Sequence, residues 1–188
     1  MSRLRLASAS PQRRAILEQL GVAFEVTPAD VEELTSGDPR ALALENARRK
    51  ALAVDGELVL GADTDVALDG EVLGKPRDAG HARELLARLA GRRHEVVGGI
   101  ALAEHGAITA EDVVVTAVDF RALDPATLDW YVATGEWRGR AGGYAIQGRG
   151  AALVAGIEGD YLNVVGLPVA RLLDLRPSLL GGASTAAG

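Results

Sequence analysis

Residues 61–76 read GADTDVALDGEVLGKP, and the interpretation of the whole chain starts from this stretch. The short apolar run Leu58–Leu60 precedes it, and an apolar run that ends at glycine is typical of a buried strand. Asp69-Gly70 lies between two apolar segments and predicts a β-hairpin. The hairpin would bring Asp63 and Lys75 close together at one end of two strands. An acid and a base at the mouth of a sheet suggest phosphate chemistry.

The composition predicts one well-packed domain. The chain has 188 residues, of which 48% are hydrophobic and 24% charged, and this excludes a disordered chain. It contains no apolar run of about 18 residues and no basic-then-apolar leader, so we expect neither a membrane span nor a secretory signal. A cytoplasmic enzyme fits these features best.

The residue types also restrict the possible ligands. The chain has no cysteine and only three scattered histidines, which argues against thiolate and histidine metal sites. Any metal would be a hard cation on carboxylate oxygens, such as Mg²⁺ or Mn²⁺. The net charge of −6 argues against stable binding to nucleic acid, whereas a nucleotide site needs only local positive charge.

Lysine is rare in this chain. Of 20 basic residues, only Lys50 and Lys75 are lysines, and a compact ammonium suits a phosphate oxygen. Lys50 belongs to a helix predicted over residues 39–54, on a face of small residues. A lysine there more often extends to solvent than serves a function. If Lys50 faces a cleft instead, it points to the same site as Lys75.

The first helix is predicted from its capping residues. Ser10 is a suitable N-cap and Pro11 a suitable first helical residue, and the helix ends at Gly21. Its N-terminus could bind an anion, which would offset the unfavourable placement of Arg13 and Arg14 in the first turn. The alternative is a capped surface helix with solvated arginines.

The remaining elements follow from hydrophobic periodicity and turn signals. The segment 135–150 is so rich in glycine that it can be neither a helix nor a plain strand, and it could wrap a ligand. Asp65 shares a strand face with Asp63, although a surface role is the favoured interpretation. We predict one domain over residues 1–176 and a disordered tail over 177–188. The other predicted elements are strands at Leu4–Leu6, Phe24–Val26, His94–Leu102, Ile108–Phe120 and Ala152–Ile157, and helices from Asp78 to Gly91, from Asp124 and over Pro168–Leu175; His81, His94 and His105 are expected to be structural or surface residues.

Five separated motifs follow one another along the chain. They are SASPQRR at residues 8–14, GADT at 61–64, GKP at 74–76, GYAIQG at 143–148 and GDYLNVVGLP at 159–168. Together they resemble the Maf family of house-cleaning nucleoside triphosphate pyrophosphatases, historically linked to septum formation. The resemblance extends over nearly the whole chain, from about Leu4 to Leu175.

The resemblance implies an α/β fold with a mixed twisted sheet, flanking helices and two lobes around a central cleft, similar to inosine triphosphate pyrophosphatases. It implies metal-dependent hydrolysis of a nucleoside triphosphate to the monophosphate and pyrophosphate, and it suggests a homodimer. The form Ile146-Gln147-Gly148 resembles the branch that acts on dTTP and UTP. The alternatives are a pyrophosphatase for 7-methyl-GTP or another modified nucleotide, and a non-catalytic nucleotide-binding regulator of septum formation.

The resemblance also implies roles for individual residues. Asp63 would accept the proton of the attacking water, and Glu33 would help Asp63 hold the metal. Two departures from the family pattern are Gln12, where arginine is common, and Arg140, where lysine is common. The residues expected to contact the phosphates are Ser8, Arg13, Lys50 and Lys75, and those expected to set base preference are Gln12, Thr64 and Gln147.

Overall fold

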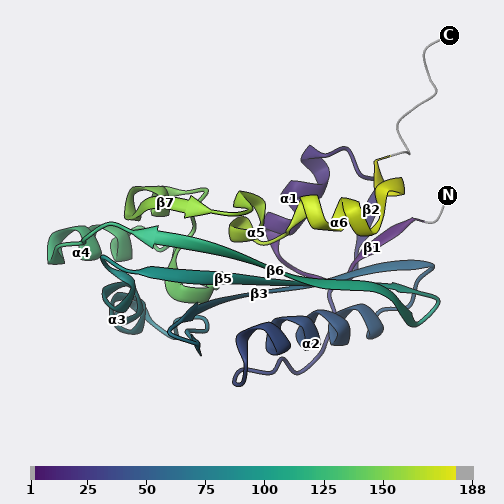
Figure 1. Cartoon of the computed structure of the whole chain (residues 1–188), viewed down its shortest axis with the longest axis horizontal. Helices are drawn as coiled ribbons and strands as arrows, with labels where there is room; N and C mark the ends of the chain where they lie inside the picture. Colours follow the sequence, from purple (N-terminus) through teal and green to yellow (C-terminus); the bar gives the residue numbers. More distant parts are fainter. Residues whose placement is uncertain (1–2, 181–188) are drawn as a thin grey trace, which may run out of the picture.

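A computed structural model describes residues 3–180, which form a single mixed sheet with helices on both faces (Figure 1). The sheet has seven strands in the order β2-β1-β3-β5-β6-β7, with β4 paired to β3. β2, β1 and β3 are parallel and the other pairs are antiparallel. The predicted α/β mixed sheet is thereby confirmed. The strands are β1 (Leu4–Leu6), β2 (Phe24–Val26), β3 (Leu58–Leu68), β4 (Glu71–Val72), β5 (Arg93–Glu104), β6 (Ala107–Phe120) and β7 (Val154–Glu158).

The helices begin where their capping residues predict. Ser10, Asp38, Asp78 and Asp124 each accept a hydrogen bond from a backbone N–H of the first turn, a donor that has no partner inside the helix. The α-helices are α1 (Pro11–Gln19), α2 (Pro39–Leu52), α3 (Ala79–Leu89), α4 (Pro125–Ala133), α5 (Tyr161–Val165) and α6 (Val169–Leu175).

Helix α2 packs very closely on one face of the sheet, opposite α1, α5 and α6 (Figure 1). Two glycines make this possible. A Cβ atom on Gly61 of β3 would lie 2.1 Å from the carbonyl oxygen of Ala47, and one on Gly99 of β5 would lie 2.2 Å from that of Ala43. Any larger residue would push the helix away, so these positions set the depth at which α2 meets the strands.

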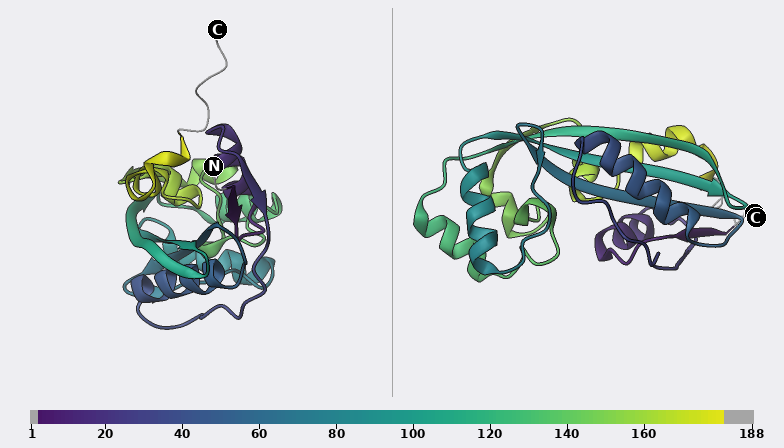
Figure 2. Two further views of the ribbon diagram at one scale, coloured as in Figure 1. Left: turned by 90° about the vertical axis from the view of Figure 1, so that its right-hand side faces the viewer. Right: turned by 90° about the horizontal axis from the view of Figure 1, so that it is seen from below.

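The large apolar side chains near the two ends of β3 belong to separate clusters. Leu58 and Leu60 pack with α1 and α6, whereas Val66 and Leu68 pack with α3, α4 and Tyr144. These helices lie toward opposite ends of the sheet (Figure 2). Thr64 lies between the two clusters along the strand. This division produces the two predicted lobes.

The predicted break after Leu58–Leu60 is wrong, because β3 continues without interruption to Leu68. Asp63 is therefore in the middle of an eleven-residue strand and not at a strand end. The hairpin itself is confirmed: Asp69 and Gly70 both have positive φ values, 53° and 81°, as a type I′ turn requires.

One edge of β3 is open at its centre. β1 pairs with it over Leu58–Leu60 and β4 over Ala67–Leu68, and among the described residues no strand covers the part between them on that side. The carbonyl oxygens of Leu60 and Val66 point to this edge, where they accept hydrogen bonds from Ala7 and Leu73. A strand with an uncovered edge presents backbone groups and side chains to a ligand at the same place.

Several smaller predictions need correction. β7 is Val154–Glu158, shifted from the predicted 152–157, and α5 follows directly where only a turn was expected. The glycine-rich segment is neither α-helix nor strand, as predicted, but it contains the 3-10 helix η1 (Ala141–Gly143) and leads into a second, η2 (Arg149–Leu153). Of the predicted tail, Pro177–Leu179 forms the 3-10 helix η3, and residues 181–188 lie outside the described part. Within residues 3–180 no helix has the length and apolarity needed to cross a membrane.

Candidate active site

A cleft of about 470 Å³ lies between the two lobes, at the open edge of β3. Its walls come from the residues before and at the start of α1, from the Pro28–Glu33 loop, from the GKP motif and from the glycine-rich segment. Its size is in the range of small-molecule binding sites. The ionisable residues that line it are Arg13, Glu33, Lys50, Asp63, Lys75, Arg138 and Arg140.

Asp63 is a buried carboxylate at this cleft, with 7% of the residue exposed. Its Oδ1 atom lies 2.6 Å from Nζ of Lys50, and its Oδ2 atom accepts a hydrogen bond of 3.0 Å from Nδ2 of Asn46. Both partners come from α2, one helical turn apart. The approach of α2 at Gly61 is therefore what gives this carboxylate its two partners.

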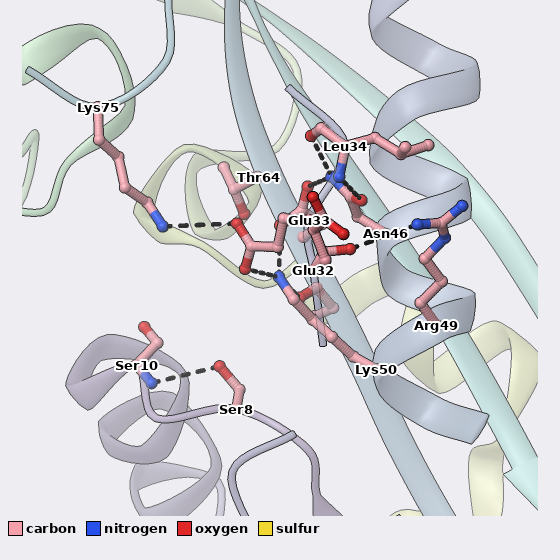
Figure 3. A network of polar contacts seen from close by, with 12 residues as sticks. Ser8, Ser10, Glu32, Glu33, Leu34, Asn46, Arg49, Lys50, Thr64 and Lys75 are labelled. Carbon is pink, nitrogen blue, oxygen red and sulfur yellow. Dashed lines mark hydrogen bonds and ion pairs between the residues drawn. The ribbon is translucent and has the colours of Figure 1, made fainter. Parts of the chain in front are cut away.

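Glu33 connects the two lysines of the chain (Figure 3). Its Oε1 atom lies 2.7 Å from Nζ of Lys50, and its Oε2 atom lies 3.8 Å from Nζ of Lys75. Lys50 is 7% exposed, so the interpretation of a solvent-directed lysine is wrong and the cleft-facing alternative is right. Asp63 and Lys75 line the same cleft, as the hairpin predicted, with Glu33 and Lys50 between them.

Arg13 is buried at the N-terminal side of the cleft. Its Nε donates to the carbonyl of Gly166 at 2.8 Å, and its terminal nitrogens donate to Oγ of Ser8 at 2.9 Å and to Oγ1 of Thr64 at 3.0 Å. No carboxylate within residues 3–180 forms an ion pair with it. Burial lowers the pKa of Arg13, while the charge of Asp63 acts in the opposite direction. A buried guanidinium that lines a cleft without a carboxylate partner is well placed for an anion.

The start of α1 combines both interpretations offered by its sequence. Arg14 is exposed and forms an ion pair with Glu18, as on a capped surface helix, whereas Arg13 turns inward. The Oγ of Ser10 caps the N–H of Arg13 at 3.4 Å and donates to Oε1 of Gln12 at 3.1 Å. Gln12 is thereby held at the rim of the cleft.

The glycine-rich segment supplies the opposite wall. Gln147 and Arg138 are exposed at the cleft, and Arg140 is half-buried there. The Nε atom of Arg140 is buried without a hydrogen-bond partner in the structure. The segment forms part of the cleft wall, and its role in wrapping a ligand stays a prediction.

Asp65 does not have the surface role that was favoured for it. Its Oδ2 atom is buried and has no hydrogen-bond partner among the described residues. Burial, and then the charge of Asp63, raise the pKa of Asp65 to about 7, while the lysines Lys50 and Lys75 act in the opposite direction. The prediction that Asp63 and Asp65 share a face is confirmed because β3 is regular across both residues.

The carboxylates at the cleft fit a hard divalent cation. No group of three or more His, Asp or Glu side chains within residues 3–180 forms a ready-made metal cage. Mg²⁺ is commonly held by one or two carboxylates together with substrate phosphates, and Glu33 and Asp63 supply such oxygens. Asp65 does not line the cleft, and its buried Oδ2 is a further hard oxygen without a donor among the described residues.

The structure brings the sequence-predicted residues together. All nine residues predicted for the site line this cleft. Sequence reasoning missed Asn46 as a partner of Asp63, although a polar amide on a face of alanines was a visible signal. Sequence reasoning also missed Arg138. This residue lies in the glycine-rich segment with two other arginines, and nothing in the sequence distinguishes it from them. The nine residues are Ser8, Gln12, Arg13, Glu33, Lys50, Asp63, Thr64, Lys75 and Gln147.

Comparisons with known proteins identify the family of this chain. The family model described as "Maf-like protein" matches residues 3–177. A dTTP/UTP pyrophosphatase of Anaeromyxobacter sp. (strain Fw109-5) is 55% identical over 179 residues, which is 92% of this chain and 87% of that one. One from Moorella thermoacetica is 47% identical over 186 residues, 93% and 94% of the two chains. A solved HAM1 protein from Coxiella burnetii is 18% identical with a TM-score of 0.46, over 64% of this chain and 73% of that one. The chain belongs to the Maf family.

Proposed function

We propose that this protein hydrolyses nucleoside triphosphates to the monophosphate and pyrophosphate, with dTTP and UTP as its preferred substrates. Membership of the Maf family supports the reaction class. Similar curated relatives carry the name dTTP/UTP pyrophosphatase, at 44–55% identity over most of their length, and this supports the choice of substrate.

The observation that carries the proposal is the charge of the cleft around a buried carboxylate. The chain as a whole has a net charge of −6, yet the cleft is lined by five basic and two acidic side chains. A nucleoside triphosphate brings about four negative charges at neutral pH, and phosphoryl transfer depends mainly on positioning and on stabilising this charge. The basic residues are Arg13, Lys50, Lys75, Arg138 and Arg140, and the acidic ones are Glu33 and Asp63.

Asp63 would act as the general base. It takes the proton of the water that attacks the α-phosphate, and pyrophosphate leaves. Each of its oxygens accepts one hydrogen bond from the protein, which leaves acceptor capacity for a water molecule. Lys50 and Asn46 hold the carboxylate in place, and such positioning makes a general base effective.

The phosphates would be bound by residues from both lobes. Arg13 and Ser8 contact them from the start of α1, and Lys75 from the opposite side. Lys50 already contacts Glu33, Asp63 and, at 3.5 Å, the carbonyl of Ala62. Its phosphate contact would therefore replace the contact with Glu33, which is the more exposed carboxylate.

Glu33 and Asp63 would hold a divalent cation, Mg²⁺ or Mn²⁺. Such an ion polarises a phosphoryl oxygen and lowers the pKa of bound water. Glu33 can serve this purpose because it is 39% exposed and faces the cleft from a loop.

Base preference would be set at the rim. Gln147 and Gln12 present amides that can both donate and accept, as the edges of uracil and thymine do. The Thr64 hydroxyl accepts from Arg13 and donates to Gly166 at 3.3 Å, so its contribution would come through the position of Arg13. Cytoplasmic location, a homodimer and the lack of stable nucleic-acid binding stay predictions.

The proposal is tested by pyrophosphate release from a panel of nucleotides with Mg²⁺ or Mn²⁺. The panel contains dTTP, UTP, 7-methyl-GTP, ATP, GTP and CTP. Wild type is compared with Asp63→Asn and with Asp69→Asn, which makes the same change in the exposed hairpin turn of the same strand. We expect Asp63→Asn to lose activity and Asp69→Asn to retain it.

The outcomes separate the alternatives. If wild type releases no more pyrophosphate than Asp63→Asn, the enzymatic proposal fails, and nucleotide binding without turnover then supports a regulator. If 7-methyl-GTP is hydrolysed at a higher kcat/KM than dTTP and UTP, the reaction class stands and the substrate assignment fails.

A further inference from the structure

Asn46 is one of the most deeply buried polar side chains of the chain, with 2% of the residue exposed. It makes three hydrogen bonds. Its Nδ2 donates to Oδ2 of Asp63 and to the carbonyl of Leu34, both at 3.0 Å, and its Oδ1 accepts from the N–H of Leu34 at 2.8 Å. Figure 3 shows the paired contacts with Leu34. Both Nδ2 hydrogens and the amide oxygen are thus in use.

These contacts allow only one orientation of the amide. With oxygen and nitrogen exchanged, the Asn46 oxygen would face two acceptors, the Leu34 carbonyl and the Asp63 carboxylate. The amide nitrogen would at the same time face the N–H of Leu34, which is also a donor. The backbone of Leu34 therefore determines that a donor, and not an acceptor, points at Asp63.

The same amide also positions the second carboxylate of the cleft. Glu33 precedes Leu34, whose two backbone groups are both bound to Asn46. This holds the loop against α2, where Glu33 meets Lys50 at 2.7 Å. Asn46 itself does not line the cleft. It can act on the reaction only through the groups that it holds.

We propose that Asn46 is a positioning residue for the reaction. It fixes the Asp63 carboxylate from helix α2 and holds the loop that carries Glu33 against the same helix. An amide is required here because the site needs two donors and one acceptor in a fixed plane. Leucine has neither, and aspartate has only acceptors. The expected effect of Asn46 on kcat rests on the proposed pyrophosphatase function. The claim that Asn46 holds Asp63 and the Glu33 loop does not depend on that function.

The kinetic test uses dTTP and UTP hydrolysis by Asn46→Ser and Asn46→Asp. Serine has too short a side chain to reach both partners, and aspartate keeps the size and the Leu34 N–H contact but turns the donor into an acceptor. Because Asn46 does not touch the cleft, we expect kcat to fall by about tenfold or more while KM stays within about threefold, as for residues behind a site. Leu42→Ala is the matched control. It lies one turn earlier on α2, is 3% exposed and does not line the cleft.

A second test needs no activity. In Asn46→Asp two carboxylates face each other, and Asp63→Asn removes this repulsion by placing an amide at the second position. We expect Asn46→Asp to lower the melting temperature less in the Asp63→Asn background than in wild type, and this difference is the recovery. If Asn46 only held Leu34, Asn46→Asp would lower the melting temperature equally in both backgrounds.

These results decide the inference. It is supported if kcat falls in folded Asn46→Ser while Leu42→Ala keeps its kcat despite a lower melting temperature. It is overturned if folded Asn46→Ser keeps kcat within about twofold of wild type, or if the double variant shows no recovery. Where Asn46→Asp does not fold, Asn46→Ser decides. An inactive wild type contradicts the proposed function instead and leaves the melting-temperature test in force.

Discussion

Nζ of Lys50 lies 2.6 Å from Oδ1 of Asp63, and both side chains are 9% exposed. The same nitrogen lies 2.7 Å from Oε1 of Glu33. One buried ammonium is therefore paired with two carboxylates. A buried charge without its partner is costly, so the fold and the site depend on the same contact.

Replacement of Lys50 by methionine keeps the length of the side chain and removes its charge. We expect the free energy of unfolding to fall by ~3 kcal/mol, because Asp63 stays buried without its cation. Denaturant unfolding measures this loss. Lys50→Met/Asp63→Asn should recover much of the stability and none of the activity. A single variant as stable as wild type would contradict the assigned charge pairing.

Lys75 has the opposite character, since its side chain is 59% exposed and its nearest carboxylate oxygen lies at 3.8 Å. We expect Lys75→Met to change the free energy of unfolding by less than ~1 kcal/mol. KM for UTP should rise by about tenfold, as one charge contact to a phosphate is lost. Initial rates over a range of UTP concentrations test this. Arg77→Met, two residues along on the exposed surface, is the control and should keep its KM.

Arg13 donates hydrogen bonds in three directions, to Gly166, Ser8 and Thr64. Lysine keeps the charge but cannot reproduce the planar arrangement. We expect Arg13→Lys to lose ~2 kcal/mol of stability and most of kcat/KM. Thermal unfolding and steady-state kinetics are the measurements. Arg14→Lys on the exposed side of the same helix should match wild type in both, and an equal loss there would refute a special role for Arg13.

Gln147 is the rim residue whose chemistry can discriminate between bases. Its amide can pair with the donor and acceptor groups of uracil, whereas a carboxylate only accepts and suits the donor edge of guanine. For Gln147→Glu we expect the ratio of kcat/KM for UTP to that for 7-methyl-GTP to fall by about tenfold. Gln19→Glu, at the exposed end of α1, tests whether added negative charge alone has this effect. An unchanged ratio in Gln147→Glu would remove Gln147 from base selection.

His94 should make the stability of the protein depend on pH. It is buried against Phe120, and its Nε2 lies 2.8 Å from the hydroxyl of Tyr144. Burial lowers the pKa of His94 to about 4, against the opposing charge of Asp119. The unfolded chain thus binds a proton at higher pH than the native protein does. The contribution of His94 to the free energy of unfolding is therefore complete above about pH 6.5. It decreases by ~3 kcal/mol as the pH falls toward 4.

Denaturant unfolding between pH 8 and 4 measures this dependence. In His94→Gln the non-titrating amide should remove that part of the pH dependence, while His105→Asn should not. His105 is exposed in the β5–β6 turn at a φ of 50°, which asparagine tolerates. An identical slope in wild type and His94→Gln would show that other groups account for the acid sensitivity.

Local signals in the sequence determined the beginnings of the helices and the hairpin. Ser10, Asp38 and Asp78 bind N–H groups two or three residues away, so their effect needs no other part of the chain. Asp69-Gly70 determines its turn in the same way. The order of five motifs was sufficient to predict the family. It also predicted those cleft-lining residues that belong to the motifs.

What the tertiary structure alone decided is the setting of Asp63. The sequence pattern predicted that Asp63 lies at a strand end beside Lys75. It lies instead in the middle of β3, in the part whose edge β1 and β4 leave open. Its partners Lys50 and Asn46 come from a helix that reaches the strand only because Gly61 lacks a Cβ atom. Such contacts join residues 13 and 17 positions apart through the packing of two elements. No local sequence preference determines that packing. The sequence therefore predicted the carboxylate, whereas only the tertiary structure showed which groups hold it.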